Sequence, residues 1–262
     1  MAQNTQTLLF DSHIHIYPFH NALNSFKAAL NNMSAIFPSG KYLACITERY
    51  DCNLYDELET GGLSEVRDFF KVEPTASTTV QKLIDSDGRE LHIIAGQQIV
   101  TSENIEILAL NMRGRVTEGA SASATVKSIL QNNGIPVVAW AVGKWFGNRG
   151  KIVTSLLDEF TPQQIALGDT SLRPIGWSTP FIMRAAEKRG FRVLAGSDPL
   201  PFGGEECRPG SYFSKIVCPH DYSIEQSLQS LLSNPDIHVG PGTNRLGVHT
   251  VAERMIKHKL AG

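Results

Sequence analysis

Three residues near the start of the chain have the types and the spacing of metal ligands. Asp11, His13 and His15 occupy alternate positions directly after the apolar run 8–10. Alternate side chains of a β-strand point to the same face, so we expect these three to converge. Imidazole nitrogen and carboxylate oxygen suit zinc, manganese or iron, and such an ion lowers the pKa of bound water toward neutrality. The motif predicts a hydrolytic metal site; the alternative is a chance His-x-His on a surface strand.

Polar residues recur where other expected strands end. Glu48 and Arg49 follow the strand expected at 42–47, Lys144 follows 135–141, Asp169 follows 164–167, and Asp198 follows 192–195. Barrels of alternating strands and helices build their active sites at these carboxyl ends. Gly and Asp at such junctions also serve as helix caps, so each residue alone fits a structural role. Their joint occurrence with two histidines favours a common site.

The elements that would position these residues alternate between strands and helices. Further segments expected to be regular are a strand at 8–16 and helices at 22–32, 63–71, 124–131, 151–159, 180–188 and 251–259. Three consecutive strands at 80–84, 92–95 and 105–110 interrupt the alternation. A chain of 262 residues suits one α/β barrel. We expect a single barrel domain over 1–262, with 202–262 as a C-terminal extension that packs on the barrel.

Composition narrows the class of protein and its partners. The formal net charge of −2 offers no clustered positive charge for a polyanion, so we expect no nucleic-acid partner. The first residues lack a basic segment followed by an apolar one, and no run of about 20 apolar residues could span a bilayer. Four scattered cysteines contain no Cys-x-x-Cys pair. Reduced thiols, no membrane contact and a cytoplasmic location are therefore expected.

The order of these motifs resembles the PHP family (polymerase and histidinol phosphatase) over residues 8–200. The matching parts are Asp-x-His-x-His at 11–15, the segments around 47–49, 96–99 and 106–110, the strand before Trp140, and the Gly-Ser-Asp at 196–198. The resemblance implies a distorted seven-stranded β/α barrel of the TIM type. It also implies metal-dependent phosphoesterase chemistry related to that of the amidohydrolases.

The resemblance further implies a reduced ligand set. His13, His15 and Asp198 match family ligands, whereas other ligand positions hold Glu48-Arg49, Gln98, Glu106, Trp140 and Leu200. Arginine stays protonated, tryptophan offers only an indole donor, and leucine offers nothing, so a three-metal cluster is not expected. We expect one zinc, manganese or iron ion on His13, His15, Asp198 and Glu106, or none. Glu48 would then serve as a base or outer ligand, with Asp198 and Lys144 also in catalysis; alternatively Arg49 replaces a metal's charge and holds the substrate.

A glycine-rich segment at 143–150 predicts a second binding element. Lys144 and Arg149 precede the helix expected from Lys151, and amides at a helix N-terminus favour anions. We expect both cations to bind a small anionic substrate, with Arg173 also at the mouth of the barrel. The alternative is a flexible lid with solvated cations.

Two functional hypotheses follow. The first is a metal-dependent hydrolase, phosphoesterase-like, with a reduced metal site. The second is a catalytically degenerate relative that binds an anionic ligand or a partner protein. The histidines of the C-terminal third, His220, His238, His249 and His258, are assigned structural or surface roles.

Overall fold

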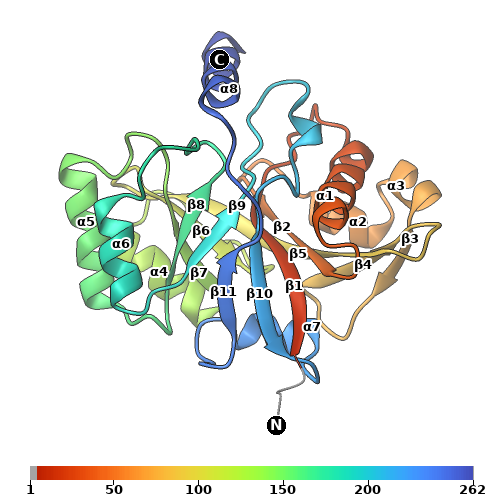
Figure 1. Ribbon diagram of the computed structural model, residues 1–262, viewed down its shortest axis with the longest axis horizontal. Helices are drawn as coiled ribbons and strands as arrows, with labels where there is room; N and C mark the ends of the chain where they lie inside the picture. The colour runs from red at the N-terminus through yellow and green to blue at the C-terminus, as the bar shows by residue number, and fades with distance from the viewer. Residues whose placement is uncertain (1–4, 262) are drawn as a thin grey trace.

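A computed structural model describes residues 5–261 of the chain, and one mixed sheet runs through them (Figure 1). Its main path is β11-β10-β1-β2-β5-β6-β7-β8-β9, while β4 pairs with β5 and β3 pairs with β4. The strands are β1 (Thr5–Ile14), β2 (Lys41–Glu48), β3 (Lys71–Pro74), β4 (Val80–Ile84), β5 (Glu90–Val100), β6 (Glu106–Leu110), β7 (Ile135–Ala139), β8 (Ala166–Thr170), β9 (Val193–Gly196), β10 (Ser214–Pro219) and β11 (His238–Pro241).

The seven strands from β1 to β9 on this path form a nearly closed, distorted TIM-like barrel, as the sequence predicts. Neighbours β1, β2 and β5 are parallel, as are β7, β8 and β9. β6 runs antiparallel to both β5 and β7, and this is the distortion. The link from β5 to β6, residues 101–105, is too short for a crossover helix, so these two strands form a hairpin.

Helices cover the outside of the barrel in two groups, α1–α3 beside β1, β2 and β5, and α4–α6 beside β6 to β9 (Figure 1). α1 begins where Asn21 accepts a hydrogen bond from the Asn24 amide, and it buries one face at 22, 26, 29, 30 and 33. The helices are α1 (Ala22–Ile36), α2 (Leu54–Thr60), α3 (Ser64–Phe69), α4 (Ala122–Gln131), α5 (Gly147–Glu159), α6 (Phe181–Lys188), the 3-10 turn η1 (Glu205–Cys207), α7 (Ile224–Gln229) and α8 (Val248–Ala261).

Successive side chains of a strand point alternately into the barrel and outward toward the helices. The hydrophobic core is therefore divided between these two places. On β1, Leu8 and Phe10 join the inner cluster with residues of β2, β5, β6, β7, β8 and β9. Leu9, between them, packs outward against α1. A third cluster lies between α4, α5, α6 and the strands they cover. The fully buried inner cluster gives the strand ends a rigid support.

The barrel closes where the end of β9 meets the end of β1. The Ser12 hydroxyl donates to the Ala195 carbonyl at 3.0 Å, and the Asp198 amide donates to the His13 carbonyl at 2.9 Å. A Cβ atom at position 196 would lie 2.3 Å from the Cβ of His13, so only glycine permits this approach. The seam therefore sets His13 beside Asp198.

Residues 202–261 contribute more regular structure than the sequence predicts. β10 pairs antiparallel with β1, and β11 pairs with β10. α8 lies at the end of the molecule opposite the start of β1 (Figure 1). The expected helix start at Lys151 is wrong, because α5 already begins at Gly147.

Two further expectations concern membrane-spanning helices and the state of the cysteines. Among residues 5–261, no helix combines the length and the apolarity that a bilayer span requires. All four cysteines are free thiols, as the sequence predicts.

Candidate metal centre

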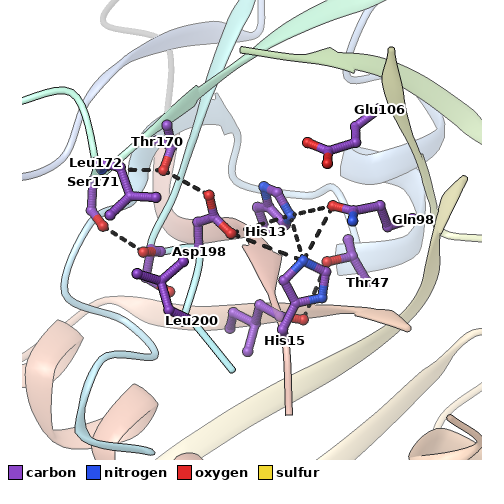
Figure 2. A network of polar contacts seen from close by, with 12 residues as sticks. His13, His15, Thr47, Gln98, Glu106, Thr170, Ser171, Leu172, Asp198 and Leu200 are labelled. Atoms are coloured by element: carbon purple, nitrogen blue, oxygen red, sulfur yellow. Dashed lines mark hydrogen bonds and ion pairs between the residues drawn. The ribbon is translucent and has the colours of Figure 1, made fainter. Parts of the chain in front are cut away.

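Two imidazoles and one carboxylate meet at the carboxyl ends of β1 and β9 (Figure 2). His13 Nε2 and His15 Nε2 are 3.0 Å apart. Asp198 Oδ1 lies 3.7 Å from the first nitrogen and 3.9 Å from the second. One ligand atom from each residue falls within 4.8 Å of the others. We call these three residues the triad; its members could hold one metal ion.

The chemistry of the triad suits a divalent transition metal. Two imidazoles with one carboxylate leave a position open for water or substrate in a tetrahedral zinc site, and the same donors bind iron. Burial lowers the pKa of His15 to about 4, so this ring is neutral near pH 7 and its nitrogen lone pair is available. The pKa of Asp198 lies below its ordinary value: burial raises it, but positive charge on His13 and His15 and the Thr170 hydroxyl outweigh that effect. Asp198 is thus an anion at neutral pH.

Backbone and side-chain contacts fix the direction of Asp198. Its φ is +49°, a left-handed conformation that costs free energy for any residue with a Cβ. The Thr170 hydroxyl, at the end of β8, donates to Asp198 Oδ2 at 3.0 Å and leaves Oδ1 toward the histidines. Backbone strain held by such contacts is frequent at functional sites.

Gln98 takes part in the same network, although it is not a charged ligand. Its Oε1 lies 3.0 Å from His13 Nε2 and 3.2 Å from His15 Nε2 (Figure 2). The resemblance places a family metal ligand at this position, and the structure brings the glutamine amide there instead. Gln98 therefore touches both rings with a neutral oxygen.

Asp11 does not join the triad, and the expectation of three converging side chains is wrong in this respect. Its carboxylate accepts hydrogen bonds from the Ser197 amide at 2.9 Å and the Gly210 amide at 2.8 Å. Asp11 of β1 pairs with Ala44 of β2, whereas Ile14 pairs with Ile46. β1 thus contains one residue more than β2 over this stretch, and this bulge breaks the alternation of side chains. Burial raises the pKa of Asp11 to about 6, although these amides partly offset it. Asp11 joins β1 to two loops.

A cavity of ≈ 430 Å³ opens beside the triad. Its walls combine cations, aromatic rings and apolar side chains from distant parts of the chain. They include His15, Gln98 and Asp198 with Tyr17, Arg49, Tyr50, Glu106, Lys144, Leu200, Met255 and His258. We call this space the triad cavity. The sequence reasoning missed Tyr17, although it follows His15 by two positions; it also missed Tyr50 and the two residues of α8.

Arg49 and Lys144 both lie at this cavity, where the sequence predicts substrate contacts. The Arg49 guanidinium lies 5.8 Å from the ring centroid of Tyr17 and 6.0 Å from that of Tyr50. Lys144 Nζ forms a close ion pair with the Glu106 carboxylate. Glu106 thus pairs with Lys144 and does not lie with the triad residues. The expectation that Glu106 is a metal ligand is therefore not met in this structure.

Three other predicted site residues point elsewhere. Glu48 accepts from the Tyr55 amide at 2.8 Å and pairs with Arg115 at 3.0 Å, so its carboxylate anchors the start of α2. Arg149 lies in the first turn of α5 and donates to the Gly143 carbonyl at 3.1 Å. Neither side chain lines the triad cavity.

Arg173 is likewise used inside the fold. Its guanidinium donates to both oxygens of Asp169, at 2.8 Å and 2.5 Å, and the Tyr212 hydroxyl donates to the same carboxylate at 2.7 Å. The side chain is buried. The expectation that Arg173 lies at the mouth of the barrel is therefore wrong, because its side chain forms an internal ion pair with Asp169.

Comparison with known proteins relates the chain by fold and not by sequence. No protein-family model and no curated protein sequence matches it. PsfC from Pseudomonas syringae PB-5123 has 13% sequence identity, with 98% of each chain covered and a TM-score of 0.50. The lesion-specific endonuclease PfuEndoQ from Pyrococcus furiosus has 14% identity and a TM-score of 0.54 over 89% of this chain. The chain spans 58% of that endonuclease's length.

These likenesses support a PHP-like barrel, in agreement with the fold class that the sequence predicts. They contradict the expectation of a small anionic substrate and no nucleic acid, because the similar structures include a lesion-specific endonuclease. An Endonuclease Q complex with a 27-mer duplex substrate also matches, with 14% identity over 88% of this chain and a TM-score of 0.49. Net charge averages over the whole surface and does not describe the charge at one cavity, which explains the error.

Proposed function

We propose that this protein is a metal-dependent phosphodiesterase whose reaction takes place at the triad, with a nucleic-acid strand as its substrate. The observation that carries the proposal is the convergence of His13, His15 and Asp198 beside the triad cavity. These three residues would hold the metal. A divalent ion bound there would polarise a phosphoester oxygen and lower the pKa of a water bound to it.

The remaining side chains of the cavity would bind and orient the phosphodiester. The Arg49 guanidinium has the planar donors that suit phosphate oxygens. Lys144 also lines the cavity, where its ammonium group pairs with the Glu106 carboxylate. A phosphate group in contact with both cations would lie beside the triad. Their positive charges would offset the negative charge of the phosphate oxygens.

The substrate class rests on the aromatic side of the cavity. The Tyr17 ring is stacked parallel to Phe19, with centroids 5.6 Å apart, and Arg49 lies beside Tyr17 and Tyr50. Phe19 and Tyr50 are exposed. Aromatic rings next to cations are how proteins bind unpaired nucleotides, since bases stack and phosphates pair. The fold likeness to a lesion-specific endonuclease supports the same class.

A cleavage assay tests this proposal. Purified protein with Mn²⁺ or Zn²⁺ is incubated with bis(4-nitrophenyl) phosphate and with single-stranded and duplex oligonucleotides. We expect cleavage by the parent, and in Asp198→Asn a loss larger than the roughly 10–100-fold caused by removing a group that only orients a ligand. His220→Ala changes an exposed histidine and should retain full activity. A parent that cleaves none of these substrates, or an equally active Asp198→Asn variant, contradicts the proposal.

Gln98 favours a second candidate, a protein that binds a phosphodiester chain without cleaving it. A neutral amide contacts both histidine nitrogens where the resemblance implies a charged ligand. Retained oligonucleotide binding with no cleavage under any metal condition would select this candidate.

A further inference from the structure

The C-terminal helix brings a histidine to the triad cavity. α8 begins 50 residues after Asp198, yet its Met255 and His258 line the cavity together with His15 and Asp198. The sequence offers no acidic or histidine-rich motif here, and His258 was expected at the surface. Its position follows from how α8 is attached.

A buried arginine attaches α8 to the loop that carries Asp198. Arg254 is 2% exposed, and its guanidinium donates to Glu205 Oε1 at 2.9 Å and to the Asp198 carbonyl at 3.0 Å. It also donates to the Ser171 hydroxyl at 2.8 Å. Every contact ties α8 to the barrel mouth. If α8 moved away from this loop, the charges of Arg254 and Glu205 would lose their partners, so these contacts hold the helix in place.

His258 lies one helical turn after Arg254, on the same face of α8. It is half-buried, and its Nδ1 is fully buried with no hydrogen-bond partner among residues 5–261. A buried polar atom that lacks a partner destabilises the folded protein, so such atoms call for an explanation. Because His258 lines the triad cavity, a rotation of the ring about its Cβ–Cγ bond would let a ligand oxygen there supply the partner that this nitrogen lacks.

We infer that His258 is a substrate-contacting residue of the triad cavity, which hydrogen-bonds a phosphoryl oxygen of the bound phosphoester. The inference rests on the proposed function for the identity of the ligand. A neutral imidazole carries one N–H in either tautomer, so the ring can donate to a phosphate oxygen without a change of charge. With Arg49 and Lys144, His258 would be a third donor around the same group, contributed by α8.

Helix α8 provides its own control for this inference. His249 is also on α8, but it is exposed and does not line the cavity. His258→Ala and His249→Ala thus remove the same side chain from the same helix. His258→Gln keeps a donor at nearly the same reach. All three changes leave Arg254 and Glu205 in place, so the helix should stay attached.

Binding of inorganic phosphate, followed by calorimetry with Mn²⁺ present, tests the inference. A hydrogen bond to a charged group contributes about 1.5–3 kcal/mol, so His258→Ala should bind phosphate about tenfold or more weakly. His258→Gln should recover part of this loss, and His249→Ala should match the parent. The affinity for Mn²⁺, titrated in phosphate-free buffer, should stay at the parent value in all three variants, and each should be fully folded at the temperature of the titration.

Several results would overturn the inference. These are a parent that binds no phosphate, equal phosphate affinity in the parent and His258→Ala, equal losses in both alanine variants, or a loss of Mn²⁺ affinity in His258→Ala. Failure of the proposed function is recognised separately, since a parent that binds no Mn²⁺ overturns it. The comparison of phosphate affinities is then made without metal and still decides the role of His258.

Discussion

At the scale of single residues, the triad depends on two imidazole nitrogens that lie 3.0 Å apart. At this distance one nitrogen must carry a hydrogen and the other must accept it. Burial lowers the pKa of His15 to about 4, so this ring is neutral near pH 7. A neutral imidazole beside an ionised Asp198 offers the lone pair and the negative charge that a cation requires.

The low pKa of His15 predicts how stability responds to acid. In the unfolded chain His15 takes up a proton near pH 6.5, while in the folded protein it does so only near pH 4. The unfolded state binds more protons between these values, so the free energy of unfolding falls as the pH falls through them. The loss due to His15 is at most roughly 3 kcal/mol.

Chemical denaturation of chelator-treated protein from pH 7 to pH 4 measures this effect. In His15→Gln this titration is absent, so the stability difference between parent and variant should shift against the parent as the pH falls. A difference that stays constant over the whole range would rule out a depressed pKa at His15.

A second prediction at this scale concerns Gln98. Replacement by Glu puts a charged oxygen where Oε1 now lies, 3.0 Å and 3.2 Å from the two ring nitrogens. Opposite unit charges about 4 Å apart attract by roughly 4 kcal/mol at a protein surface, so Gln98→Glu should tighten Mn²⁺ binding by about tenfold or more. Calorimetric titration gives the affinity. Gln131→Glu, on α4 and outside the cavity, serves as the charge-matched control, and an equal gain there would contradict the prediction.

At the scale of elements, the site depends on the seam between β9 and β1. A Cβ at Gly196 would meet the His13 Cβ at 2.3 Å and the His13 amide nitrogen at 2.8 Å. Backbone atoms cannot move aside as the end of a flexible side chain can, so Gly196→Ala must push the two strands apart.

Gly196→Ala is expected to lower the free energy of unfolding by about 2 kcal/mol or more and to weaken Mn²⁺ binding, because it displaces His13 from Asp198. Gly203→Ala, in the loop that follows, has nothing within 4 Å of the new Cβ and should behave like the parent. Urea unfolding and metal titration of both variants provide the measurement. A stable Gly196→Ala protein with normal metal affinity would show that the seam does not position the triad.

The elements also explain which of the predicted site residues the structure brings together. His13, His15 and Asp198 follow short apolar strands, and the ends of parallel strands gather at one edge of a barrel. Asp11 was misplaced because a bulge of one residue breaks the strand alternation, and sequence patterns do not reveal such a bulge. Glu48 was misplaced because a backbone amide of α2 captures its carboxylate.

Contacts between distant elements are harder to predict than strand ends. His258 reaches the cavity only because Arg254 pairs with Glu205, 49 positions earlier in the chain. Likewise, the short strand β10 pairs with β1, which is distant in the sequence, and β11 pairs with β10 across a long connection. In each case, long-range pairing decides the structure, and the local pattern of residues carries little information about it.

At the scale of the whole molecule, the barrel joins three distant regions at one cavity. The start of the chain provides His15 and Tyr17, the strand β5 provides Gln98, and the C-terminal region provides Asp198 and α8. We propose that residues 1–262 act as one unit, since α8 is attached to the loop that carries a triad member. The account as a whole rests on whether the triad binds a metal.

Metal content after purification without added metal tests this central claim most directly. Plasma mass spectrometry should find close to one zinc, manganese or iron ion per parent chain, and almost none in a His13→Gln, His15→Gln double variant that still folds. A His220→Gln, His238→Gln double variant, which changes two exposed histidines, should keep the parent's content. A parent without bound metal and without affinity on titration, or a triad variant that retains its metal, would contradict the account.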